Sequence, residues 1–338
     1  MSHAVTLIPG DGIGPEITVA TRKVLEATGV RFEWDEQVAG MAGVDRAGDP
    51  LPDATVESIR RTHLALKGPL TTPVGTGYRS VNVGLRKEFE LYANLRPVRS
   101  FQGIGKFANV DLVLVRENVE GLYVGVEHFV RVGSDPRAVA ESMAIVTRVG
   151  CERIVRYAFE YALRNGRKKV TIVHKANILK MVSGLFLEVG RTVGAEYEGR
   201  VAFNDLIIDN TAMQMVIRPE QFDVLVTTNM FGDILSDLAA GLVGGLGLAP
   251  GGNIGTHAAI FEAVHGSAPD IAGKSIANPA ALILAGAMML DHLGEAGAGN
   301  AVRAAVARVV EQDQVRTRDL GGSATTTEFG DAVVRRIA

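Results

Sequence analysis

Two aspartates four residues apart are placed to hold a divalent cation. Asp233 and Asp237 lie in the stretch 232–238, whose residue pattern predicts a helix, so that both carboxylates share one helix face. Like charges at this spacing repel each other, but a cation bound between the two carboxylates makes the net electrostatic interaction favourable. Hard cations such as Mg²⁺ or Mn²⁺ prefer carboxylate oxygens. Asp209, which follows a separate apolar run, is the candidate third ligand; for the pair alone, a solvated helix face would be the better interpretation.

Arginines form a second group with its own chemistry. Arg86, Arg96 and Arg116 each lie in a largely uncharged stretch of sequence. A guanidinium group binds a carboxylate through two parallel hydrogen bonds. Three such residues predict an anionic substrate with several carboxylates. Surface ion pairing is the alternative interpretation, and it fits Lys87 and Arg99 better.

Short apolar runs precede many of these polar residues. They span residues 112–115, 170–173, 206–208 and 224–226. Runs that are apolar on both faces are typical of strands buried between two layers. Each run breaks into polar residues, among them Arg116, Lys175 and Asp209. Because ligands bind beyond the carboxyl ends of strands in open α/β sheets, the four breaks predict one site.

The remaining pattern predicts an α/β fold with a largely parallel sheet. We predict a strand at residues 4–8 and a helix that starts at Pro15. Two further helices are predicted at residues 275–293 and 301–310. The glycines at 10, 12 and 14 do not fit G-x-G-x-x-G, because Pro15 occupies the third glycine position. A classical dinucleotide-binding fold is therefore disfavoured.

Length and composition limit the function further. The 338 residues suggest about two domains, and 47% are hydrophobic. A formal charge of −3 argues against a nucleic-acid partner. The longest apolar run, 280–290, is too short to span a membrane. The single Cys151 cannot form an internal disulfide, and the first residues do not resemble a signal peptide, so we expect a cytoplasmic protein.

The sequence resembles the β-decarboxylating dehydrogenases, which comprise isocitrate, isopropylmalate, homoisocitrate and tartrate dehydrogenases. The matching segments span 8–16, 91–97, 116–123, 174–177, 229–237 and 265–274, with 319–322 near the end. The resemblance implies a two-domain α/β fold that is not a Rossmann fold. It implies a large cofactor-binding domain at 1–98 and 252–338, and a small substrate and dimerisation domain at 99–251. It also implies a homodimer or higher homo-oligomer whose active sites are shared between subunits.

The resemblance also assigns roles to individual residues. The metal, Mg²⁺ or Mn²⁺, would bind Asp233 and Asp237 of one protomer, together with Asp209 of the partner subunit. The substrate would meet Ser80, Asn82, Arg86, Arg96 and Arg116. Tyr123 and Lys175 of the partner subunit would form the acid–base pair, with Asn177 beside them. The cofactor NAD would meet Thr72 at its nicotinamide, and His265, Gly266, Ala268, Asp270, Ile271 and Asn278 at its adenosine.

The segment before Arg86 resembles that of isocitrate dehydrogenases most. Ser80 and Asn82 offer polar partners to the third carboxylate of isocitrate, whereas isopropylmalate enzymes have apolar residues there. We therefore expect NAD-dependent oxidative decarboxylation of isocitrate, a small tricarboxylate, to 2-oxoglutarate. Homoisocitrate is the first alternative, because residues 117–123 resemble those enzymes equally, and 3-isopropylmalate is the next. A non-catalytic regulatory subunit is less favoured, because Tyr123 and Lys175 are both present.

Overall fold

The computed structural model describes residues 2–73 and 77–337. Its contacts divide the chain into two compact units. Unit 1 comprises Met1–Leu91, Arg96–Val110 and Ala240–Ala338, and unit 2 comprises Tyr92–Leu95 and Asp111–Ala239. Residues 99–110 and 240–251 thus group with unit 1, whereas the resemblance assigns them to the small domain. The domain boundaries inferred from that resemblance stay a prediction.

Unit 1 contains a sheet whose strands run in the order β2-β1-β3-β12-β11. Their bounds are Arg31–Glu36, Ser2–Ile8, Leu64–Lys67, Ala259–Ala263 and Pro250–Ile254. Neighbours are parallel except β11 and β12, which are antiparallel. β4 (Ala93–Arg99) has residues in both units. The expected strand at 4–8 is confirmed as the greater part of β1.

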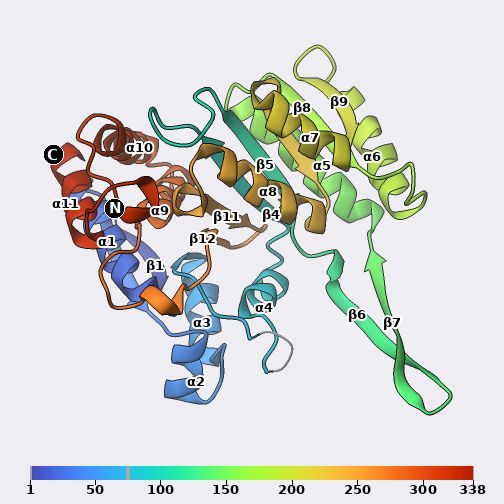
Figure 1. Ribbon diagram of the computed structural model, residues 1–338, viewed down its shortest axis with the longest axis horizontal. Helices are drawn as coiled ribbons and strands as arrows, with labels where there is room; N and C mark the ends of the chain where they lie inside the picture. Colours follow the sequence, from blue (N-terminus) through green and yellow to red (C-terminus); the bar gives the residue numbers. More distant parts are fainter. Residues whose placement is uncertain (1, 74–76, 338) are drawn as a thin grey trace. The chain divides into compact units, whose positions relative to one another are not determined.

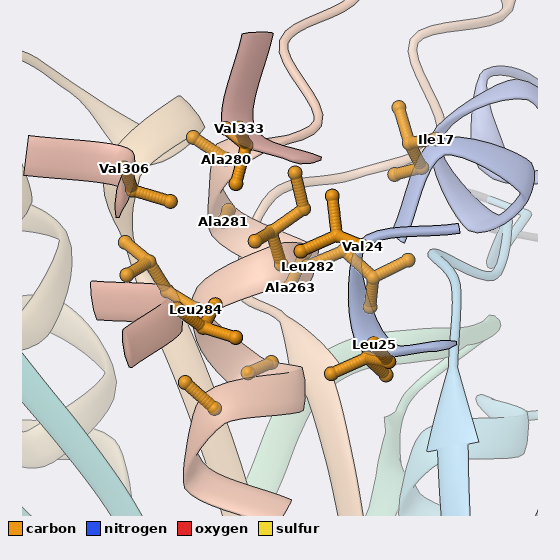
Figure 2. Close-up of a cluster of buried hydrophobic side chains, with 14 of the residues drawn as sticks. Ile17, Val24, Leu25, Ala263, Ala280, Ala281, Leu282, Leu284, Val306 and Val333 are labelled. Carbon is orange, nitrogen blue, oxygen red and sulfur yellow. The ribbon is translucent and has the colours of Figure 1, made fainter. Parts of the chain in front are cut away.

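The core of unit 1 surrounds one central helix, α9 (Ala280–His292). This helix is apolar on nearly every side, and Leu282 and Ile283 are fully buried. Side chains of α1 (Gly14–Ala27), α10 (Ala296–Glu311) and α11 (Thr326–Ile337) pack around it (Figure 2). The other helices of unit 1 are α2 (Met41–Ala47), α3 (Asp53–Thr62) and α4 (Val81–Glu88), with 3₁₀ turns at Leu246–Leu248, Pro269–Ile271 and Arg318–Leu320.

One helix start differs from the sequence prediction. The helix expected at 275–293 begins only at Ala280, directly after Pro279. Proline has no N–H to donate within a helix and disfavours helical backbone in the residue before it, so residues 275–279 remain outside. The helices expected after Pro15 and at 301–310 are confirmed as parts of α1 and α10.

Unit 2 contains a fully parallel sheet in the order β5-β10-β8-β9. The strands span Asp111–Glu117, Val224–Thr227, Lys169–His174 and Ala202–Ile207. The helices of this part are α5 (Arg148–Arg164), α6 (Val182–Glu196), α7 (Ile208–Ile217) and α8 (Asn229–Val243), and a 3₁₀ turn spans Pro219–Gln221. Three of the four apolar runs lie wholly within these strands.

The fourth run, 206–208, crosses an element boundary. β9 ends at Ile207, and Ile208 already begins α7. Asp209 therefore lies in the first turn of a helix and not in a loop after the strand. A carboxylate is favourable there, because the first N–H groups of a helix point toward it.

A long antiparallel hairpin projects from the rest of unit 2 (Figure 1). It is formed by β6 (Gly121–Val132) and β7 (Asp135–Ile145). Apolar side chains on both strands face solvent, with Phe129 51% and Met143 57% exposed. Among the described residues, no helix combines the length and the apolar character needed to cross a membrane.

Candidate active site

The end of β5 and the start of α8 meet at a buried arginine. Arg116 is only 1% exposed, and its Nε and Nη2 donate to Oδ1 of Asn229 at 3.0 and 2.7 Å. Its Nη1 forms an ion pair with Asp233, one helical turn further along α8. Asn229 Nδ2 in turn donates to the carbonyl of Glu120 at 3.2 Å. The guanidinium group is therefore held from two sides.

The close approach of α8 to Arg116 requires a glycine. A Cβ on Gly232 would lie 2.4 Å from Oγ1 of Thr227 and 2.6 Å from Cγ of Arg116. Any side chain at this position would push the helix away from the strand end. The sequence therefore fixes the distance between the guanidinium group and the carboxylates of α8.

Tyr123 completes this group from the hairpin. Its hydroxyl donates to Asp233, and the guanidinium of Arg116 lies 5.3 Å from the centre of its ring. A phenol assigned through the resemblance, and a carboxylate and a cation selected from the sequence pattern, are thus brought together in unit 2. Asp237 lies one turn further along α8 and is exposed.

A second pair of charged side chains, Lys175 and Asp209, lies two strands further across the same sheet, where β8 and β9 end. Lys175 follows β8, and its Nζ donates to Oδ1 of Asp209 at 2.6 Å. This hydrogen bond holds the pKa of Asp209 below its usual value. Asn177 is exposed in the turn after Lys175. Within the described part of this single chain, no three His, Cys, Asp or Glu side chains form a group that could hold a metal ion.

In unit 1, the helix α4 presents the residues that the resemblance assigns to substrate. Ser80 precedes its first residue, and Asn82 and Arg86 lie one turn apart. Asn82 Oδ1 is buried and has no hydrogen-bond partner among the described residues. A polar substrate group could use that hydrogen-bonding capacity. Arg96, in β4, is 6% exposed.

Behind Arg86 lies an ion network that the sequence analysis did not identify. Glu262 and Lys67 are register partners on the parallel strands β12 and β3, and their side chains meet at 2.7 Å. Arg86 Nη2 lies 3.6 Å from the same carboxylate, and Asn253 Nδ2 donates to it at 2.7 Å. Burial alone would raise the pKa of Glu262, but the two cations outweigh it and lower the pKa to about 2. Lys67 ends the apolar strand β3 and Glu262 lies within the apolar strand β12, so a charge in each short apolar strand is a signal for the two residues, although not for their pairing.

The residues assigned to the adenosine side lie around a loop after β12. His265 Nδ1 contacts the carbonyl of Gly266 at 2.9 Å, whereas its Nε2 is buried and has no partner among the described residues. Burial lowers the pKa of this histidine. A Cβ on Gly266 would meet nothing within 4 Å. The Nε2 acceptor of His265 and the open space at Gly266 are separate features of this loop.

The other residues of this side differ in their surroundings. Asn278 is used within the fold, because its Nδ2 donates to Asp319 and its Oδ1 accepts from the first N–H of α9, both at 2.9 Å. Asp270 is exposed, and Ile271 is half-buried beside it. Ala268 adopts left-handed backbone with φ of 39°. Thr72 is exposed in the loop after β3.

Comparison with known proteins places these features in context. Residues 4–333 match the isocitrate/isopropylmalate dehydrogenase family. The isocitrate/homoisocitrate dehydrogenase of Thermus thermophilus is 51% identical over 339 residues, which cover 100% of this chain and 99% of that protein. A mitochondrial regulatory subunit of the NAD isocitrate dehydrogenase of Dictyostelium discoideum is 49% identical over 335 residues, or 98% of this chain and 91% of that protein.

A solved structure agrees over the same length. The crystal structure of isocitrate dehydrogenase from Methylococcus capsulatus is 60% identical, with a TM-score of 0.96 and 99% of both chains covered. Further relatives are named for different cofactors, NAD in Arabidopsis thaliana and NADP in Thermus thermophilus.

Proposed function

Because this chain belongs to the isocitrate/isopropylmalate dehydrogenase family, we propose that it catalyses the NAD-dependent oxidative decarboxylation of isocitrate to 2-oxoglutarate. The observation that carries the proposal is the contact of Arg116, Tyr123 and Asp233 in unit 2. It supplies an anion-binding group, a proton donor and a carboxylate in one place. The choice of isocitrate rests on Ser80 and Asn82, which are polar where a hydrocarbon tail would need apolar neighbours.

In the proposed reaction, the residues of this chain bind the substrate and transfer protons. Arg86, Arg96 and Arg116 bind substrate carboxylates and orient the molecule. Lys175 of the partner subunit takes the proton of the 2-hydroxyl, and NAD, when bound, would supply the hydride acceptor for carbon 2. Tyr123 donates a proton to the carbon that loses CO₂, and the guanidinium against its ring stabilises the phenolate that results.

A divalent metal, when bound, supplies a Lewis acid at the hydroxyl and its neighbouring carboxylate. Asp233 and Asp237 would hold it from one face of α8. A third carboxylate would strengthen this site, and the candidate, Asp209, pairs with Lys175 elsewhere in the same chain. We therefore propose that Asp209 of the partner subunit completes the ligand set.

The proposed partner is a second copy of this chain. Unit 2 exposes large apolar side chains on its hairpin and on two helices, and an interface between two copies could cover them. Examples are Val132 at 59%, Ile217 at 59% and Ile234 at 59% exposure. Their burial in a homodimer would bring two copies of unit 2 together and allow shared sites.

We propose NAD as the cofactor because Asp270 is exposed beside the proposed adenosine site. Its carboxylate can accept hydrogen bonds from ribose hydroxyls and would repel a 2′-phosphate. NADP is the alternative, because one relative is named for it. The cytoplasmic location also stays a prediction from the sequence, since several relatives are named as mitochondrial.

Two other functions have support. Homoisocitrate is the first alternative substrate, because one relative's name includes it. A regulatory subunit is the second alternative function, because one relative is so named. Against the latter, the acid–base and carboxylate residues are all retained, among them Tyr123, Lys175 and Asp233.

A steady-state assay of the purified chain tests the proposal. Isocitrate, homoisocitrate and 3-isopropylmalate are each supplied with NAD or NADP and Mg²⁺ or Mn²⁺. We expect the highest kcat/KM for isocitrate with NAD, and no turnover in excess chelator. A higher kcat/KM for 3-isopropylmalate than for isocitrate would contradict the substrate proposal. Full activity in excess chelator would contradict the proposed requirement for a divalent metal. No turnover of any substrate would favour the regulatory subunit.

A further inference from the structure

The glycine-rich turn after β1 lies between two loops that the proposed function uses. One is 68–73, which contains Thr72, and the other is the loop after β12, which contains His265 and Gly266. The Asp11 N–H donates to the Pro69 carbonyl at 2.8 Å, and the Ile13 N–H donates to the Ser267 carbonyl at 2.9 Å. The turn therefore contacts the backbone of both loops, all within unit 1.

The glycines of this turn are required by how tightly it packs. A Cβ on Gly12 would lie 1.9 Å from the carbonyl oxygen of Ser267, and one on Gly10 would lie 2.3 Å from that of Pro69. Both glycines also have positive φ, 59° and 81°. Their purpose is close contact with neighbouring protein backbone, which explains why the turn departs from the dinucleotide fingerprint.

The side chain of Asp11 ties this turn to its surroundings on two sides. It is 6% exposed. Its Oδ1 accepts from the N–H groups of Met41 and Ala42 at 2.9 and 3.3 Å, and its Oδ2 accepts from Thr71 at 2.8 Å. All three partners are backbone donors. Only a carboxylate, with an acceptor oxygen on each side, satisfies them together.

The Thr71 residue held by Asp11 also joins the two loops directly. Its hydroxyl bonds that of Ser267 at 2.7 Å. One loop leads on to Thr72, on the proposed nicotinamide side, and the other carries the proposed adenosine side. The spacing between the two ends of the cofactor site is therefore set through Asp11, Thr71 and Ser267.

We propose that Asp11 is a positioning residue for the nicotinamide cofactor. It does not touch the cofactor; it fixes the loop that contains Thr72 at a set distance from the loop that contains His265. The inference rests on the proposed function, because it takes the two ends of the cofactor site from there.

The test compares the whole cofactor with its adenosine half. Asp11→Asn keeps the size of the side chain but turns an N–H₂ group toward a backbone N–H. Affinities of the purified full chain for NADH and for AMP are measured by titration calorimetry. We expect NADH to bind about tenfold more weakly, because the two loops are no longer held at the spacing that the whole cofactor needs. AMP, which reaches only the loop after β12, should keep its affinity within about twofold.

Two further variants make the result specific. Ser267→Ala removes only the hydroxyl bond to Thr71. It should weaken the binding of NADH and leave the affinity for AMP unchanged, and it remains a test even if Asp11→Asn does not fold. Thr6→Val is the matched control, because it removes buried hydroxyl bonds to Ser58 and Thr62 in the same unit. It should leave the affinity for NADH unchanged.

The outcomes separate this inference from the proposed function. The positioning role would be overturned if Asp11→Asn and Ser267→Ala left the affinity for NADH unchanged. It would also be overturned if they weakened the binding of NADH and of AMP equally. A wild-type chain that binds neither NADH nor NADPH would overturn the proposed function, and this inference with it.

Discussion

A single buried carboxylate, Glu262, stabilises two buried cations in unit 1. Lys67 is 2% exposed and Arg86 11%, and both ion pairs use the same carboxylate. Without it, two like charges would face each other away from solvent. Removing one partner of a buried ion pair is far more costly than its net contribution suggests, because the remaining charge is left uncompensated.

We predict that Glu262→Gln lowers the free energy of unfolding by about 3–5 kcal/mol at pH 7. The pKa of Glu262 is lowered in the folded state from 4.5 to about 2. Its contribution is therefore complete above pH 4.5 and is lost as the pH falls toward 2. Urea unfolding at several pH values should show the largest deficit above about pH 5, and a smaller one near pH 3.

Glu57→Gln is the control for this measurement, since that carboxylate is 63% exposed in its ion pair with Arg60. Its effect should stay below about 1 kcal/mol. An equal deficit for Glu262→Gln at pH 3 and pH 7 would show that the buried carboxylate does not ionise with the lowered pKa.

The proposed preference for NAD also rests on single residues. Asp270→Lys with Ile271→Tyr replaces a repelling carboxylate by groups that bind a phosphate. The ratio of kcat/KM for NAD to that for NADP should fall about a hundredfold. Glu33→Lys makes the same charge change on β2 and should leave the ratio unchanged. Equal use of both cofactors by the unmodified chain would refute the assignment.

Sequence reasoning found some of these residues and missed others for a physical reason. Arg116 and Lys175 come at the ends of apolar runs, so their place at strand ends could be predicted, and Asp233 lies in α8, where the sequence predicted a helix. Tyr123 was identified only through the family resemblance. Lys67 and Glu262 meet through the register of β3 and β12, 195 positions apart in sequence, and no local pattern encodes that pairing. Asp11 is likewise defined by partners that come from distant loops.

At the scale of elements, the position of α8 against β5 is constrained by several contacts in unit 2. Arg116 is held by Asn229 and Asp233 on that helix, and Gly232 allows the contact. Strands that are apolar on both faces could be predicted, whereas the largely exposed strands β6 and β7 of the hairpin could not. Element ends were predicted less well, because Pro279 and the direct passage from β9 into α7 depend on single residues.

We predict that Gly232→Ala lowers the free energy of unfolding by about 1–3 kcal/mol, because its methyl group would overlap Thr227 and Arg116. The shifted guanidinium should also raise the KM for isocitrate. Gly241→Ala, on the same helix, is the matched control, since its Cβ would meet nothing within 4 Å. It should stabilise the protein slightly. Equal effects of the two changes would argue against the close contact.

At the scale of the whole molecule, the proposed dimer can be tested by mixing inactive subunits. Lys175→Met and Tyr123→Phe should each be inactive alone. A heterodimer of the two keeps one site in which both residues are intact, so mixing should restore roughly a quarter of wild-type activity after random exchange. No recovery after verified exchange would show that each site lies within one chain.

The two-unit division has a consequence for synthesis. The faces of α1 that hold Ile17 and Val24 are covered by α9 and α11, which come near the other end of the chain (Figure 1). At ribosomal speed, α1 waits roughly 13 to 50 seconds before residue 280 is made. Most of unit 2 is contiguous and can assemble during that interval. The N-terminal helix thus remains an apolar, unfinished surface on the nascent chain, of the kind that chaperones bind.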